Sequence, residues 1–171
     1  NWYIVQVEGD YIGAVSKKYG KPIYPNSTNT GSNNGNNQDT TTSSLSADER
    51  EVFDLINKQR TDNGIQALKV DDEVQRVARI KAQDMVDNNY FAHESPTYGT
   101  PFNMLKSFKV SYKTAGENIA GNSSNKNAVT SWMNSSGHKA NILNSAFNYT
   151  GIGVVNSSKY GKVFVQMFIG K

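Results

Sequence analysis

Apolar residues are spread unevenly along this chain, and a stretch without any of them divides it. Residues 26–44, NSTNTGSNNGNNQDTTTSS, contain no apolar side chain. Such a segment cannot bury a core, and its composition is typical of a flexible linker. The pattern therefore predicts a short N-terminal segment over residues 1–25, a linker over 26–44 and a main domain over 45–171.

The main domain is predicted to begin with an amphipathic helix. Ser46 followed by Glu49 is the sequence signature of a capping box at a helix start. Val52 and Ile56 then recur at helical spacing, which indicates one buried face. Gly64 supplies a C-terminal stop.

Two further helices are predicted before the middle of the domain. Asp71 or Asp72 can cap the first of them. After a loop over residues 90–96, Thr100 and Pro101 mark the start of a short helix, because proline is favoured in the first turn. The inner face of the longer helix is apolar and rich in alanine: Val74, Val77, Ala78, Ala82, Met85 and Val86.

Three stretches favour strands, over residues 112–120, 151–156 and 162–169. The last alternates two apolar sets, Val163, Val165, Met167 and Ile169 on one side and Phe164 and Phe168 on the other. A strand that is apolar on both faces is covered on both sides. We therefore predict an α+β fold, a three-layer α–β–α sandwich with a small antiparallel sheet between helices.

The stretch 131–144, SWMNSSGHKANILN, predicts the end of one helix and the start of another. Ser135 and Ser136 offer a hydroxyl as N-cap for the second helix. His138 then lies in its first turn, where the helix dipole disfavours a protonated imidazole. A neutral imidazole is the form that binds metal ions or relays protons, although a lone histidine is more often a satisfied structural side chain.

Composition narrows the class of protein. The 171 residues are 36% hydrophobic and include no cysteine, which excludes a disulfide framework, a thiolate metal site and a cysteine nucleophile. The mean hydropathy of −0.62 is low for one compact body. No apolar run has the length of a transmembrane helix, and no signal peptide precedes Asn1, so we expect a processed or trimmed product. Abundant Asn, Ser and Thr suit a secreted protein of a Gram-positive bacterium.

Charge is divided between the two parts of the chain. Residues 95–171 contain eight lysines and a single acidic residue, Glu117, whereas residues 1–94 carry a net negative charge. One hypothesis is a basic face for an anionic partner such as wall polymer or lipid headgroups. The alternative is ordinary solvation of two halves that interleave in space. No nucleic-acid partner is predicted.

Two imidazoles and a carboxylate are the candidate chemistry of the main domain. His93 and His138 are the two histidines of the chain, and Glu117 lies between them in sequence. Two histidines and a carboxylate are common ligands of an open site for Zn²⁺ or another divalent cation. No local HExxH signature fixes the geometry, so the spacing by itself is a weak signal.

The N-terminal segment resembles the first half of a LysM module, a small carbohydrate-binding unit. A strand over residues 2–7, a turn at Gly9-Asp10 and a helix from Tyr11 to Tyr19 that ends at Gly20 would match its opening. The second half of such a module is missing, and half a module cannot bury enough surface to fold alone.

The main domain resembles the CAP (SCP/PR-1-like) superfamily in its bacterial secreted form. Four blocks carry the resemblance, in the order and spacing of that superfamily. They are the NxxRxxxGxxxLxxD pattern (Asn57, Arg60, Gly64, Leu68, Asp71), the helix with Ala78, Ala82 and Met85, the loops FAHESP (91–96) and AGENIA (115–120), and SWMNSSGHKANILN followed by Gly151-Ile152-Gly153.

The resemblance implies an α–β–α sandwich whose central cleft is lined by two histidines and two glutamates, with zinc or another divalent ion bound in some members. His93, Glu117 and His138 match three of those four positions. The second glutamate corresponds to Ser135 here, which puts a complete tetrad in doubt. Glu94 could add a carboxylate, but nothing in the sequence places it in the cleft.

Three functions stay open at this point. The first is a secreted binding module whose cleft takes a small ligand, lipid, peptide or cell-wall glycan, at the cell wall or spore surface. The second is a metal-assisted peptidase or esterase in which His93 and His138 hold the ion and Glu117 is the third ligand or the general base. The third is a structural domain with a hydrogen-bonded polar cluster. No serine stands out as a nucleophile, no acidic residue is evidently paired with either histidine, and the oligomeric state cannot be predicted.

Overall fold

The computed structural model describes residues 2–7, 11–16 and 45–171. The chain divides into two compact units, residues 1–39 and 40–171, and each is treated by itself. The predicted linker 26–44 lies outside the described residues.

The described part of the first unit is an antiparallel pair of strands, β1 (Trp2–Val7) and β2 (Tyr11–Ser16). The predicted strand over residues 2–7 is confirmed, whereas the helix predicted from Tyr11 is wrong over residues 11–16. Tyr11, Ile12 and Val15 belong to the residue types with high strand propensity, so local preference favours the strand. The strand–helix order expected of a LysM-like opening is therefore not found in these residues.

The second unit contains five helices and four strands in its described part. The helices are α1 (Ala47–Asp62), α2 (Asp72–Asp87), α3 (Pro101–Ser107), α4 (Asn125–Asn134) and α5 (Ser136–Ile142). The strands are β3 (Lys69–Val70), β4 (Thr114–Asn122), β5 (Tyr149–Ser157) and β6 (Gly161–Gly170). They form one sheet in the order β3-β5-β6-β4, which is parallel between β3 and β5 and antiparallel elsewhere. The sheet is therefore mixed and not purely antiparallel as predicted, because the two-residue strand β3 adds a parallel pairing.

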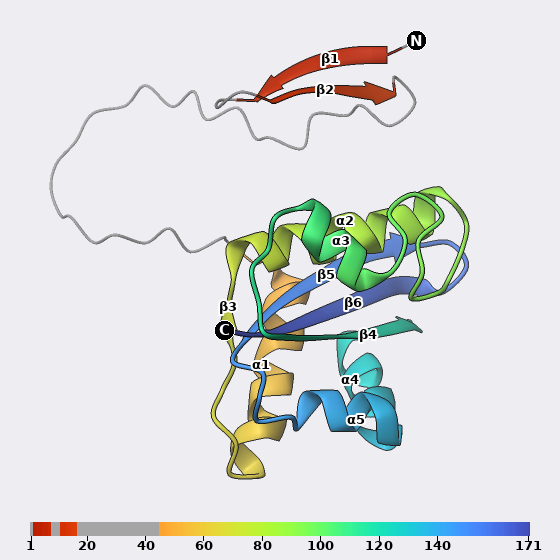
Figure 1. Cartoon of the computed structure of the whole chain (residues 1–171). Coiled ribbons are helices and arrows are strands. Elements are labelled where there is room, and N and C mark those ends of the chain that lie inside the picture. Colours follow the sequence, from red (N-terminus) through yellow and green to blue (C-terminus); the bar gives the residue numbers. More distant parts are fainter. Residues whose placement is uncertain (1, 8–10, 17–44) are drawn as a thin grey trace, which may run out of the picture. The chain divides into compact units, whose positions relative to one another are not determined.

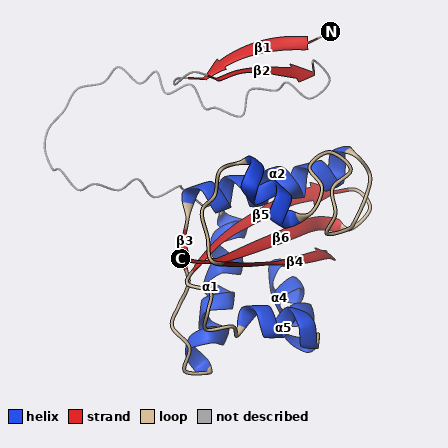
Figure 2. Cartoon of the chain, viewed as in Figure 1, coloured by secondary structure: helices blue, strands red, loops and turns tan. Residues whose placement is uncertain are grey.

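Helices cover both faces of this sheet, so the predicted three-layer α–β–α sandwich is confirmed. α2 and α3 lie on one face, and α1, α4 and α5 lie on the other (Figures 1 and 2). The two apolar sets of β6 divide as the alternation predicts. Val163, Val165, Met167 and Ile169 join the core under α2 and α3, and Phe164 and Phe168 join the core under α1, α4 and α5.

Three predicted helix starts, those of α1, α2 and α3, are confirmed at their caps. Ser46 and Glu49 form a reciprocal capping box at α1. Asp71 caps α2 by accepting a hydrogen bond from the Val74 backbone, and Thr100 caps α3 with Pro101 in the first turn. Each cap satisfies backbone N–H groups that a helix start leaves without a partner.

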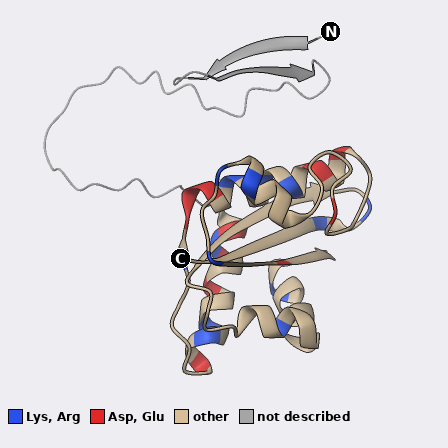
Figure 3. Cartoon of the chain, in the orientation of Figure 1, with Lys and Arg blue, Asp and Glu red and all other residues tan. Residues whose placement is uncertain are grey.

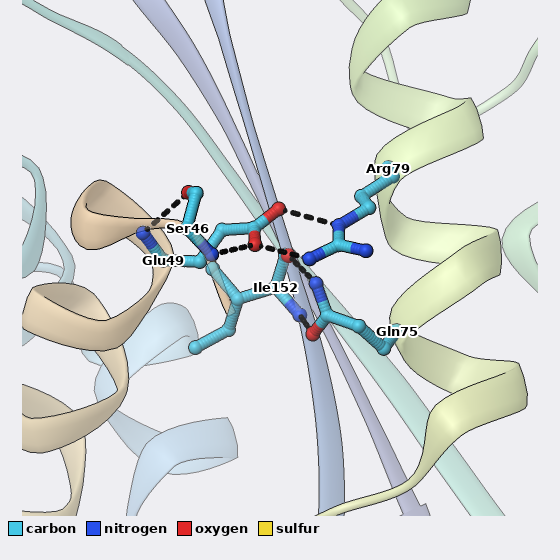
Figure 4. Close-up of polar contacts among 5 residues, drawn as sticks. All are labelled: Ser46, Glu49, Gln75, Arg79 and Ile152. Carbon is cyan, nitrogen blue, oxygen red and sulfur yellow. Dashed lines mark hydrogen bonds and ion pairs between the residues drawn. The ribbon is translucent and has the colours of Figure 1, made fainter. Parts of the chain in front are cut away.

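α2 packs directly on the backbone of β5 because two glycines leave room for it. A Cβ added to Gly151 would lie 2.3 Å from the Val74 carbonyl oxygen, and one added to Gly153 would lie 2.3 Å from that of Ala78. Between these glycines, the buried Gln75 amide accepts from the Ile152 N–H at 2.8 Å and donates to its carbonyl at 2.5 Å (Figure 4). The side chain thus pairs with β5 beyond the end of the two-residue strand β3.

The start of α1 is held to α2 by a buried carboxylate. Glu49 accepts from Arg79 at 2.8 Å (Nε to Oε1) and 2.6 Å (Nη2 to Oε2), and it also closes the capping box with Ser46 (Figure 4). These contacts tie helices on opposite faces of the sheet to each other.

Acidic residues from before position 95 and lysines from after it lie next to each other within the second unit. Acidic and basic residues occur in both helical layers (Figure 3). Lys162 pairs with Asp48 at 2.7 Å, and Lys171 pairs with Asp71 at 2.5 Å. Pairing between the halves favours the solvation hypothesis over a separate basic face.

Candidate functional site

The loop between α2 and α3 brings His93 to the strand β4. Its Nδ1 lies 2.7 Å from Oε1 of Glu117. The Glu117 side chain is 3% exposed, whereas the His93 side chain is 55% exposed, so the imidazole covers the carboxylate and still faces solvent. Sequence analysis found no acidic partner for either histidine, because a contact across 24 residues leaves no local signature.

Protonation of this pair follows from burial and proximity. The hydrogen bond to Glu117 raises the pKa of His93 above its ordinary value. Burial raises the pKa of Glu117, and the His93 hydrogen bond and the Lys81 charge oppose that shift without overcoming it. Both shifts act in the same direction, so the pair keeps its protons to higher pH than the separate groups would.

A buried polar network holds the loop that carries His93. The Lys81 ammonium is fully buried and donates to the His93 carbonyl at 2.7 Å and to the Tyr90 hydroxyl at 3.1 Å. Tyr90 and Ser95 both donate to Asp84, the latter at 2.7 Å. Burial lowers the pKa of Lys81. Sequence reasoning missed this network, although a lysine and an aspartate on the apolar face of a helix were a usable signal.

His138 lies in the first turn of α5, as predicted, but the predicted cap is only half right. Ser135 occupies the N-cap position, yet its hydroxyl makes no capping bond. It lies instead 2.9 Å from Nδ1 of His138. Burial lowers the pKa of His138, and the charge of nearby His93 lowers it further. The ring therefore favours the neutral form that the sequence predicted.

The two histidines approach β4 from opposite faces of the sheet. Glu117 is in register with Met167 and faces α2, whereas the next residue, Asn118, is in register with Gln166 and faces the other layer. There Asn118 donates to the His138 carbonyl at 3.1 Å and accepts from Asn141 at 2.9 Å. The site thus straddles one edge strand.

Both rings have the same arrangement of partners. In each, Nδ1 is engaged by an oxygen, from Glu117 or from Ser135, and no hydrogen bond to Nε2 is formed within the described residues. The second carboxylate oxygen of Glu117 is buried without a partner in the same part of the chain. Among those residues, no three His, Asp or Glu side chains are grouped as ligands of one ion. Glu94 is exposed beside His93.

Two surface hollows lie away from these histidines. A shallow one of about 510 Å³ follows the outer side of α1 between Ala47 and Lys58. The other, of about 240 Å³, borders Arg60, Gly64 and Phe147. Neither hollow is lined by His93, Glu117 or His138. The candidate site is therefore identified from the contacts of these three side chains and not from a hollow.

The structure thus combines an α–β–α sandwich with a histidine–glutamate pair at the edge strand and a second histidine in the first turn of α5. These are the features expected of a CAP-type domain. The sequence profile of the CAP family, described as the cysteine-rich secretory protein family, matches residues 53–168. The chain therefore belongs to the CAP family. This confirms the resemblance drawn from the four sequence blocks, and it lends no support to the LysM-like start.

Relatives of known sequence or structure agree with this assignment. YkwD of Bacillus subtilis (strain 168) is 52% identical over 130 residues, which cover 75% of this chain and 49% of that protein. The B. subtilis membrane protein YlbC is 38% identical over 122 residues, 71% of this chain and 34% of YlbC. The crystal structure of an extracellular SCP-domain protein from Bacillus anthracis is similar with a TM-score of 0.68 and 40% identity, over 72% of this chain and 40% of that one.

The fold is also shared at low sequence identity. An outer surface protein from Borrelia burgdorferi is 22% identical with a TM-score of 0.67, over 72% of this chain and 92% of that one. The chain spans about half of YkwD and a third of YlbC. None of the helices in the described residues is long and apolar enough to cross a bilayer.

Proposed function

We propose that this domain is an extracellular binding module whose site at the β4 edge takes a small ligand together with a divalent metal ion. The observation that carries the proposal is the shared arrangement of His93 and His138, with Nδ1 engaged and no hydrogen bond to Nε2 from the described residues. Histidines that bind metal commonly donate their other ring N–H to a carboxylate or another oxygen, which fixes the ring orientation.

The donor set suits a borderline cation such as Zn²⁺. Imidazole nitrogens are favoured ligands of zinc, and two protein ligands leave positions for a bound ligand or water. His93 and His138 would hold the ion through Nε2. Glu117 would orient His93 through Oε1, which Nδ1 engages, and its buried Oε2, which has no partner among the described residues, would be the oxygen left to act as a third ligand. When bound, the ion would supply Lewis acidity.

The exposure of His93 favours a binding role over a sealed structural cluster. A polar plug that only stabilises the fold would be buried on all sides, whereas the His93 side chain is 55% exposed. The Lys81 network holds the backbone of the same loop from below. A rigid support beneath an exposed imidazole is the arrangement expected of a preorganised site.

The test is calorimetric titration of Zn²⁺ into the protein without a histidine tag. The chain has two histidines and both belong to the site, so no other imidazole then competes for the ion. We expect His93→Ala and His138→Ala each to weaken binding at least tenfold, about 1.4 kcal/mol, through loss of a ligand. The matched control is Glu94→Gln, which neutralises the exposed carboxylate next to His93 and should leave the affinity unchanged. Equal affinity in the wild type and both histidine variants would refute the proposal.

One observation favours a second candidate, a metal-assisted hydrolase. A buried carboxylate 2.7 Å from an imidazole is a pair that can accept and release a proton. Turnover of a peptide or ester substrate that is lost in Glu117→Gln would support it. Ligand binding that survives this change, with no turnover in the wild type, would support the binding module.

We further propose that the domain acts outside a bacterial cell, at the cell wall or spore surface, on a lipid, peptide or wall glycan. The B. anthracis structure carries the description of an extracellular protein, and the B. burgdorferi structure that of an outer surface protein. Fractionation of the native host, followed by detection of the protein in the wall or spore coat, tests this location.

A further inference from the structure

An aromatic pair, formed by the exposed Phe91 and the partly buried Tyr160, lies near the histidine–glutamate site. Phe91 is one of two large apolar side chains exposed among the described residues, at 37%, and it belongs to the loop that carries His93. Its ring contacts that of Tyr160 at the β5–β6 turn, with centroids 5.1 Å apart and planes inclined by 44°. The Lys159 ammonium lies 5.1 Å from the centre of the Tyr160 ring.

The pair is built on a glycine of β4. A Cβ at Gly121 would lie 2.9 Å from the Tyr160 ring, so the missing side chain lets this ring lie against the strand. Any larger residue there would displace the ring. The aromatic pair is therefore seated on the strand that also carries Glu117.

One row of side chains connects the two features. Glu117, Ile119 and Gly121 share the face of β4 that is turned toward α2, because side chains alternate along a strand. Four residues of strand place Gly121 about 13 Å from Glu117. The loop from Phe91 to His93 covers at most about 7 Å of backbone, and its side chains extend to both places, Phe91 to Tyr160 and His93 to Glu117.

The size of the apolar surface selects among ligand classes. Among the described residues, the large apolar side chains that reach the surface here are Phe91 and, in part, Tyr160, which is too little to bury an acyl chain or to dock on a membrane. A sugar ring needs only one aromatic face for its C–H groups, and polar partners for its hydroxyls. Lys159 supplies a cation within reach of an acidic substituent.

We propose that Phe91 and Tyr160 form a saccharide subsite of the β4 edge, which stacks a pyranose ring of a wall glycan next to His93. This subsite deepens the proposed function and rests on it for the ligand site that it adjoins. A sugar that carries a carboxylate binds at least as tightly as a neutral one, because Lys159 lies beside the ring pair.

The test is titration of the full chain, followed by NMR and calorimetry, with two probes. One is a neutral N-acetylglucosamine oligomer and the other a peptidoglycan fragment that contains muramic acid. We expect Phe91→Ala and Tyr160→Leu each to weaken binding about fivefold, the size of one aromatic contact. Phe102→Ala is the control, since Phe102 is 50% exposed on α3 and takes no part in the ring pair.

The outcomes separate this inference from the metal proposal. Saccharide binding that survives His93→Ala but falls in Phe91→Ala supports the subsite even where zinc is not bound. Binding that is absent, or equal in the wild type and both aromatic variants, overturns it. Phe91-dependent binding to lipid vesicles with no response to either saccharide overturns it as well.

Discussion

Arg60 is the residue whose replacement tests the account of the fold most directly. The residue is 1% exposed, and its guanidinium donates to four backbone carbonyls: Gln66 at 2.8 Å, Ile142 at 2.7 Å, Asn144 at 2.9 Å and Phe147 at 2.9 Å. Two of these carbonyls, those of Ile142 and Asn144, lie at the C-terminal end of α5, where the helix dipole favours a positive charge. No acidic side chain takes part in these four bonds.

The stability lost on replacing Arg60 depends on which of the four carbonyls can be hydrated afterwards. The bonds to Ile142 and Phe147 are buried, whereas those to Gln66 and Asn144 are partly buried. Each stranded buried acceptor costs about 1–3 kcal/mol, and the partly buried ones can be hydrated. Part of this cost is offset, because the substitution also removes a charge that is desolvated in the folded state. Burial lowers the pKa of Arg60, which reflects that desolvation. We expect Arg60→Met to lower the free energy of unfolding by about 3–5 kcal/mol.

Urea unfolding of the full chain, followed by circular dichroism, measures this loss. Arg60→Lys keeps the charge but loses the planar fork, so it should cost roughly half as much and keeps the test possible if Arg60→Met does not fold. Lys58→Met removes an exposed pair with Asp62 from the same helix and should cost less than about 0.5 kcal/mol. A loss below about 1 kcal/mol for Arg60→Met would refute the reasoning.

Three further predictions concern packing and charge. Gly151→Ala should lower the free energy of unfolding by about 2–4 kcal/mol, because the added Cβ would lie 2.3 Å from α2. The control is Gly137→Ala, whose added Cβ would have no neighbour within 4 Å. In thermal unfolding this control should be neutral or stabilising by up to about 1 kcal/mol. Trp132→Phe should cost about 1–3 kcal/mol by leaving a buried carbonyl without its 3.0 Å indole donor, and an unchanged urea midpoint would contradict this. Hydrogen bonds from Lys162 and from the Asn125 amide lower the pKa of Asp48 in the folded protein. The stability that Asp48 contributes is therefore fully present above the ordinary aspartate pKa of ~3.9, and it is lost as the pH falls through the lower pKa of the folded state. The difference between wild type and Asp48→Asn should therefore shrink on acidification.

Local signals explain why most of the fold could be predicted. The capping box at Ser46 and the proline after Thr100 act within one helical turn, so sequence neighbours suffice to locate the helix starts. The two apolar faces of β6 required two covering layers, and both layers exist. The predicted bounds of β5 and β6 fall one or two residues short at each end, where alternation gives way to turn residues.

The errors arise where a specific side-chain or strand contact overrides the preference that the local pattern indicates. The predicted helix from Tyr11 rests on the stop signal at Gly20, whereas strand propensity and pairing with β1 prevail over residues 11–16. Ser135 has the sequence of an N-cap, but His138 one turn later takes its hydroxyl. No sequence pattern connects Lys81 and Asp84 to the site, because their partners lie on a loop several residues beyond the end of their own helix.

The register of β4 is what turns these separate residues into a site. Glu117 and Asn118 are adjacent, and a slip of one residue would exchange them, placing an amide under His93 and a carboxylate beneath α5. The pairing of nine residues with β6 opposes such a slip, and Trp132 adds a fixed point by donating to the Ile119 carbonyl at 3.0 Å. Since His93 reaches Glu117 from one face and His138 reaches Asn118 from the other, both histidines depend on this single alignment. A change in β4 that weakens pairing should therefore disturb both imidazoles together, while a change in either helix should disturb one.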